Sequence, residues 1–148
     1  MSLELVISEE VITMKIEHIA MYVSDLEATR NFFMTYFSAT CNEKYHNPKT
    51  GLQTYFLSFP EGGRLEIMTR PNLSVDNRSE RHPHQGSVYK TGFTHVAFSL
   101  GSKDAVDKLT QRLQVEGYAV LDGPRTTGDG YYESVVEGPE GNLLELTV

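Results

Sequence analysis

The sequence has one cysteine, few basic side chains and no long apolar run. The single Cys41 excludes an internal disulfide and any zinc site built from several cysteines. The 13 Lys and Arg residues stand against 20 Asp and Glu residues, and the resulting net charge of -7 disfavours a nucleic-acid partner, whose phosphates attract cations. No apolar stretch approaches the roughly 18 residues that a membrane span needs.

The beginning of the chain also lacks the features of a signal peptide. Residues 1–13 contain neither a basic start nor an apolar block, so we expect a soluble protein of the cytoplasm. Among the 148 residues, 39% are hydrophobic and 22% are charged. A chain of this length and composition can bury the core of one domain without covalent cross-links.

The sequence contains an internal repeat. The segment Lys-Ile-Glu-His-Ile-Ala that begins at Lys15 aligns with Gly-Phe-Thr-His-Val-Ala from Gly92. A later segment, Pro-Glu-Gly-Gly-Arg-Leu-Glu from Pro60, aligns with Pro-Glu-Gly-Asn-Leu-Leu-Glu from Pro139. Two similar units, each with a histidine near its start and a glutamate near its end, therefore make up most of the chain.

Each unit is expected to fold as βαβββ. A period of two around the first histidine predicts a strand, and Ser24 followed by Glu27 resembles a capping box at the start of a helix. In the second unit we expect the helix to begin at Ser102 and to stop at Gly117. The remaining predicted strands are 55–59, 64–69, 93–100, 118–121, 131–136 and 143–148, with a weaker one at 42–46.

We therefore expect an α+β protein whose eight main strands form a curved mixed sheet around a cavity. Residues 1–13 are interpreted as an N-terminal extension, and residues 14–148 as a single domain. Within this domain, module one spans 14–71 and module two spans 91–148. The stretch between them, residues 72–90, is rich in Asn, Ser, Arg, His and Pro and reads as a linker.

Four repeated polar residues occupy matching places in the two units. Strand alternation turns His18 and His95 away from the helix of their unit, and it turns Glu66 and Glu145 away in the same manner. If the sheets curl, two imidazoles and two carboxylates can converge in a partly apolar cup. Such a set suits a divalent metal ion, namely Ni, Co, Zn, Mn or Fe, with positions left for water or substrate oxygens.

Each of these residues also has a simpler interpretation. A histidine on a strand is often a hydrogen-bonded core residue, and Pro-Glu-Gly between strands is first of all a turn signal. The matching registers favour a metal site, because neighbouring positions such as Tyr22 and Ser99, or Arg64 and Leu143, differ between the copies.

The twofold βαβββ pattern with these four residues resembles the vicinal oxygen chelate superfamily, also called the glyoxalase/bleomycin-resistance fold. The resemblance covers about residues 14 to 148 and implies a divalent metal held by His18, Glu66, His95 and Glu145, in a cavity often completed by a homodimer. It further implies a lyase or isomerase similar to glyoxalase I (lactoylglutathione lyase), which transfers a proton through a metal-bound enediolate. In that case Glu145 is the first candidate for the base and Glu66 the second.

The resemblance implies a small-molecule substrate, and a thiol adduct is one candidate. Glyoxalase I acts on the hemithioacetal of methylglyoxal and glutathione and usually has Arg and Asn where this chain has Tyr22 and Arg70, so its glutathione pocket is not reproduced. Arg70 is either a rim group that holds a carboxylate or an ordinary exposed arginine. One of Tyr131 and Tyr132 is expected to face the cavity, since neighbours on a strand alternate.

Residues of the linker are further candidates for the pocket wall. The linker contains a cationic set that forms either a lid or, more simply, a solvated loop: Arg78, Arg81, His82 and His84. Cys41 and His46 have no counterpart in the repeat and are interpreted as structural or incidental.

Several other functions share this fold. An epimerase similar to the methylmalonyl-CoA enzyme uses the same proton abstraction, and a drug-binding protein similar to bleomycin-resistance proteins needs no metal. An extradiol dioxygenase needs only two histidines and one carboxylate, so the fourth ligand argues against it. Thiol transfer to fosfomycin lacks an obvious cation-binding loop.

Overall fold

The computed structural model describes residues 15–74 and 93–148. All of residues 1–13 and residues 75–90 of the 72–90 linker, including the four residues of its cationic set, therefore lie outside the described residues. The first module contains, in chain order, β1 (His18–Tyr22), α1 (Leu26–Tyr36), β2 (Thr40–Cys41), β3 (Tyr45–His46), β4 (Gln53–Ser58) and β5 (Arg64–Thr69).

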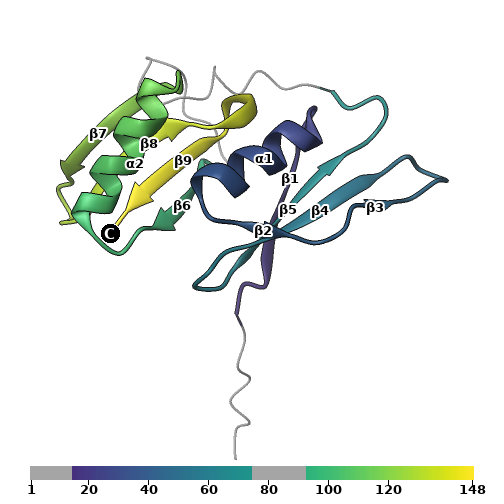
Figure 1. The fold of residues 1–148 in the computed structure, drawn as a ribbon, viewed down its shortest axis with the longest axis horizontal. Coiled ribbons are helices and arrows are strands. Elements are labelled where there is room, and N and C mark those ends of the chain that lie inside the picture. The colour runs from purple at the N-terminus through teal and green to yellow at the C-terminus, as the bar shows by residue number, and fades with distance from the viewer. Residues whose placement is uncertain (1–14, 75–92) are drawn as a thin grey trace, which may run out of the picture.

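The second module repeats this order (Figure 1). It contains β6 (His95–Ser99), α2 (Lys103–Val115), β7 (Val120–Thr126), β8 (Tyr132–Glu137), the short 3₁₀ turn η3 (Pro139–Gly141) and β9 (Leu143–Thr147). Neither helix of the described part is long and apolar enough to cross a membrane.

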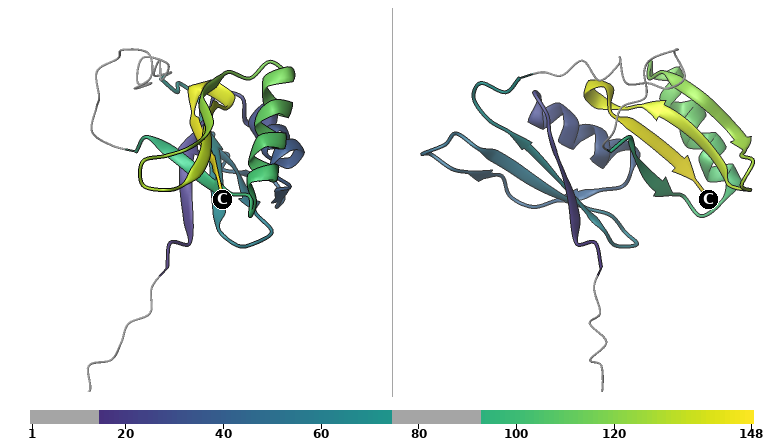
Figure 2. Two further views of the ribbon diagram at one scale, coloured as in Figure 1. Left: turned by 90° about the vertical axis from the view of Figure 1, so that its left-hand side faces the viewer. Right: turned by 180° about the vertical axis from the view of Figure 1, so that it is seen from behind.

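The strands form two mixed sheets, which confirms the α+β class. One sheet has the order β1-β5-β4-β2 with β3 also paired to β4, and the other has the order β6-β9-β8-β7. In each sheet the first strand of the module pairs with its last strand in parallel, and the other pairs are antiparallel. Within one chain the sheets stay separate instead of joining into one curved eight-stranded sheet, as Figure 2 shows from two sides.

The outer edges of both sheets are irregular. Strands β2 and β3 lie along the same edge of β4, and between them Asn42 both donates its N–H to Phe56 and accepts the Phe56 N–H with its side chain. The two short strands are therefore one edge strand interrupted by a bulge, which replaces the single strand predicted at 42–46. In the second sheet, β7 shifts register twice along β8.

The start of α1 differs from the predicted capping box. Asp25, not Ser24, is the N-cap, and its carboxylate accepts the Ala28 N–H at 2.9 Å. Glu27 does not reach back to the cap, because its carboxylate is held by Lys44 and by the hydroxyl of Tyr55. The prediction was wrong by one residue, since aspartate and serine are equally good caps and sit side by side here.

The second helix begins and ends as predicted. The Ser102 hydroxyl accepts the Ala105 N–H at 3.2 Å. After the C-cap Glu116, Gly117 takes a left-handed conformation with φ 96°, which most residues avoid.

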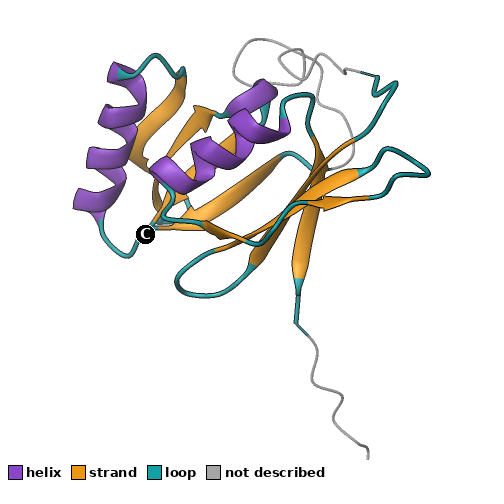
Figure 3. Cartoon of the chain, turned by 45° about the vertical axis from the view of Figure 1, so that its right-hand side comes forward, coloured by secondary structure: helices purple, strands orange, loops and turns teal. Residues whose placement is uncertain are grey.

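Helix α1 lies at the junction of the two modules (Figure 3). Phe33 faces the core of its own module and lies 6.1 Å, between ring centroids, from Phe98 of β6. Phe32 lies 5.0 Å from Tyr118 of the second module. One aromatic cluster therefore joins both modules, and α1 is buried on two sides where α2 is buried on one.

Candidate metal site

Strand alternation places the predicted site residues as the sequence indicates. In β5, Leu65 and Ile67 are buried against the α1 side of the sheet, whereas Glu66 between them points to the other face. In the second module Leu144 and Leu146 are buried and flank Glu145 in the same way. Each module thus has an open face that its helix does not cover.

On the open face of module one, His18 and Glu66 form a pair. The Nε2 atom of His18 is 3.7 Å from a carboxylate oxygen of Glu66. The other ring nitrogen, Nδ1, donates to the carboxylate of Glu17, which is itself held by the Arg64 guanidinium, with Nε to oxygen at 2.7 Å. The hydrogen bond from His18, and then Arg64, lower the pKa of Glu17, so Glu17 stays ionised and orients the imidazole.

On the open face of module two, His95 and Glu145 repeat this arrangement. The Nε2 atom of His95 is 3.2 Å from a carboxylate oxygen of Glu145. Its Nδ1 is 2.9 Å from the hydroxyl of Thr94. In both modules the side chain just before the histidine therefore engages Nδ1 and leaves Nε2 facing the glutamate, which is the arrangement common for metal-binding histidines.

The structure brings the four residues together as two pairs and not as one cluster. Within the described ranges 15–74 and 93–148, no three His, Cys, Asp or Glu side chains are grouped closely enough to hold a metal ion. Each pair supplies one imidazole nitrogen and one carboxylate, and both glutamate side chains are less than one-fifth exposed. This donor chemistry fits one half of a divalent-cation site in each module.

A further carboxyl group lies beside Glu145. Glu133 projects from β8 on the same open face, on the strand paired with β9, and hydrogen-bonds with Glu145. Burial raises the pKa of Glu133, and the charge of Glu145 raises it further. Two adjacent carboxyl groups are costly to ionise without a cation, which supports a cation-binding role for this face.

In the metal-free protein, Glu133→Gln is expected to stabilise the fold at neutral pH. The native carboxyl keeps its proton to a higher pH than the unfolded chain does, so stability falls as the pH rises from the ordinary glutamate pKa through the raised one. The substitution removes this loss. Urea unfolding of the unaltered protein and of the variant at about pH 4 and about pH 7 gives the free energy of unfolding, from which this loss follows. Glu43→Gln on the exposed surface serves as the control, and an equal change at both pH values would contradict the argument.

The four residues predicted to contact the substrate lie in different surroundings. Tyr22 lies on the open face beside Met68 and is 41% exposed, and Arg70 is exposed just after β5. Tyr132 packs on the helix side, where its hydroxyl donates to Asp107 of α2 at 2.5 Å, so it does not line the open face. Its neighbour Tyr131 precedes β8 and is 56% exposed.

Three residues that contact these pairs were not identified from the sequence. Glu17 and Thr94 occupy the same repeat position, directly before each histidine, and this shared place was the available signal. Glu133 could have been assigned to the open face by alternation along its strand, but its contact with Glu145 depends on the sheet register. Cys41, by contrast, is partly buried against the core, in agreement with a structural role.

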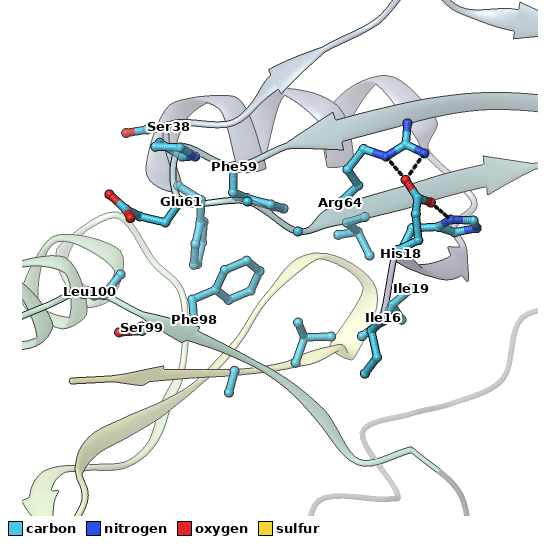
Figure 4. A pocket seen from close by; sticks show the side chains of 18 of the residues that line it. Ile16, His18, Ile19, Ser38, Phe59, Glu61, Arg64, Phe98, Ser99 and Leu100 are labelled. Carbon is cyan, nitrogen blue, oxygen red and sulfur yellow. Dashed lines mark hydrogen bonds and ion pairs between the residues drawn. The ribbon is translucent and has the colours of Figure 1, made fainter. Parts of the chain in front are cut away.

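A cavity of about 530 Å³ lies between the modules, bounded by β1, the turn between β4 and β5, and β6 (Figure 4). Phe59 and Phe98 pack edge to face in its wall, with their ring centroids 5.1 Å apart. Ile19 of β1 lines this cavity and is 39% exposed. Ile16 beside it is 80% exposed, so the inner edge of module one presents a largely apolar surface.

Comparison with known proteins agrees with the resemblance that the sequence shows. A family model described as the Glyoxalase/Bleomycin resistance protein/Dioxygenase superfamily matches residues 15–146. The uncharacterized protein YqjT of Bacillus subtilis (strain 168) is 30% identical over 132 residues, which are 87% of this chain and 94% of that protein.

Solved structures share the fold. A possible glyoxalase from Bacillus cereus is 26% identical with a TM-score of 0.65, and the match covers 92% of this chain and 100% of that one. A mutant of the genomically encoded fosfomycin resistance protein FosX from Listeria monocytogenes is 20% identical with a TM-score of 0.66, covering 92% and 93%. That structure contains Mn(II) and 1S,2S-dihydroxypropylphosphonic acid.

Proposed function

Because the chain belongs to the glyoxalase/bleomycin resistance protein/dioxygenase superfamily, we propose that it is a divalent-metal-dependent lyase or isomerase that moves a proton next to a carbonyl group. The observation that carries this proposal is the repeated pair of an oriented imidazole and a carboxylate, one on the open face of each module. The superfamily contains metal-dependent enzymes, and the FosX structure holds Mn(II).

Four side chains would hold the metal: His18, Glu66, His95 and Glu145. When bound, a divalent ion of the Ni, Co, Zn, Mn or Fe type supplies a Lewis acid that polarises substrate oxygens. Glu17 and Thr94 keep Nε2 of each imidazole directed at the site through their contacts with Nδ1.

Glu145 is proposed as the group that removes and returns the substrate proton, with Glu66 as the second candidate. The carboxylate of Glu145 has Glu133 beside it, so a proton taken up by Glu145 has a hydrogen-bonding partner within the site. Tyr22 and Arg70 are proposed to contact the substrate from module one, together with the exposed Tyr131 of module two.

We further propose that two chains complete the site as a homodimer. Each chain offers two half-sites that do not meet, and in its described part β1 and β6 each pair on one side only. An edge strand with free N–H and C=O groups can pair with a strand of another chain. Pairing β1 of one chain with β6 of its partner would bring the His18–Glu66 pair of one chain next to the His95–Glu145 pair of the other. The cytoplasm is the proposed location, and a small oxygenated molecule is the proposed substrate.

Metal analysis of protein purified without added ions tests the proposal. We expect about one divalent ion per chain, with a large loss in both His18→Ala and His95→Ala. His46→Ala removes an exposed histidine of β3 and should leave the metal content unchanged. A metal content near zero in the unaltered protein, or one that His18→Ala does not change, would favour a drug-binding protein instead.

A further inference from the structure

Glu140 has an unusual backbone for a glutamate. It lies in η3 with φ 59° and ψ 32°, the left-handed region that disfavours residues with a Cβ. In the described part of the chain, the other non-glycine residues with positive φ are Ser38 and Asn72. Glycine or asparagine would fit this turn with less strain, so the glutamate side chain must supply an interaction that offsets it.

That interaction crosses from module two to module one. The carboxylate of Glu140 accepts the Ser24 N–H at 2.6 and 2.9 Å and the Asp25 N–H at 3.3 Å, although the partners are 116 and 115 residues apart. These N–H groups lie just before α1, where the helix dipole also favours a negative charge. Charge-assisted bonds of this kind are stronger than neutral ones.

The contact joins the two strands that carry the histidine of one half-site and the glutamate of the other. Ser24 follows β1, which begins with His18, and the intervening Val23 is buried and hydrogen-bonded to Met68. On the other side, η3 leads into β9, which carries Glu145. A change at this contact is therefore passed along short, ordered segments to both open faces.

A second contact holds the opposite end of α1. The hydroxyl of Tyr36 donates to Glu116 after α2, and this bond raises the pKa of Tyr36 to about 12. The modules are thus fastened at both ends of α1. If the Glu140 contact is lost, the Tyr36 contact and the aromatic cluster still join the modules, and we expect their relative placement to loosen at the Glu140 end.

We propose that Glu140 is a positioning residue that fixes module two on module one and so sets the relative placement of the His95–Glu145 and His18–Glu66 pairs. Its importance for metal binding rests on the proposed function, whereas its effect on module placement does not. The role is specific to this turn. The repeat partner Glu61 has no positive φ, and within residues 15–74 and 93–148 it makes no hydrogen bond.

The first test measures module placement in metal-free protein. Spin labels at exposed Thr35 of α1 and Gln111 of α2, in a Cys41→Ala background, report the distance between the helices by double electron–electron resonance. We expect Glu140→Gly to broaden or shift the distance distribution, although it relieves the backbone. Glu140→Gln keeps one acceptor oxygen and should show a smaller effect. Ser102→Ala, which removes a helix cap inside module two only, should leave the distribution unchanged.

The second test measures Co²⁺ binding by its absorption spectrum. Glu140→Gly is expected to weaken Co²⁺ binding about tenfold, because small misplacements of ligand groups are costly, while Ser102→Ala binds as the unaltered protein does. An unchanged distance distribution in Glu140→Gly would overturn the inference. If the unaltered protein binds no Co²⁺, the proposed function fails, and the spin-label distances alone decide the role of Glu140.

Discussion

Replacing Glu145 with glutamine is expected to reduce turnover by about 10²- to 10⁴-fold, the usual contribution of a general base. The amide has nearly the same shape as the carboxylate and cannot take up the proton, so substrate binding should weaken much less than turnover does. Steady-state kinetics of metal-loaded protein, with methylglyoxal and several thiols as substrates, measure kcat and KM separately.

The control for this experiment is Glu43→Gln, an exposed substitution of the same kind that should leave both constants unchanged. Equal losses in turnover and in substrate binding would contradict a proton-transfer role for Glu145. If the protein converts an acyl-CoA but no thiol adduct of methylglyoxal, the function is that of an epimerase similar to the methylmalonyl-CoA enzyme.

Mixing two inactive variants should restore activity. In the proposed homodimer, the His18→Ala and His95→Ala variants would each lack one ligand in both sites, and we expect them to be nearly inactive. In a mixed dimer both substitutions fall in one site and the other site is intact, so equal mixing should recover about one quarter of the unaltered activity. The measurement is activity and metal content after the chains are unfolded together and refolded.

The matched control mixes His18→Ala with Glu66→Gln, which alter the same half-site. Every dimer then has both sites impaired, and no recovery is expected. If His18→Ala and His95→Ala also fail to complement each other while both refold, the four ligands do not come from two chains.

The repeat and the alternation of strands predicted much of this protein. The family match and the solved structures confirm the resemblance drawn from the four repeated residues, and the strands carry His18 and Glu66 on one open face as expected. Helix α2 was predicted at both ends, because Ser102 and Gly117 act through local chemistry that sequence alone displays.

The parts that sequence missed depend on contacts between distant segments. The pairing of Glu140 with Ser24 requires the two modules to be packed together, and in the sequence Pro139-Glu140-Gly141 reads only as a turn. Likewise, alternation fixes the face of a sheet and not the distance between two sheets, so the sequence could not show that the four candidate ligands form two separate pairs within the described part of one chain.

The bulge that divides β2 from β3 limits which sheet edges can pair with another chain. A strand that is short and broken offers no continuous row of N–H and C=O groups, and β7 at the far edge of the other sheet is disturbed by its register shifts. The regular edges are those of β1 and β6, which lie at the inner ends of their sheets. If sheets of two chains pair, we therefore expect the pairing to use β1 and β6 and not the outer edges.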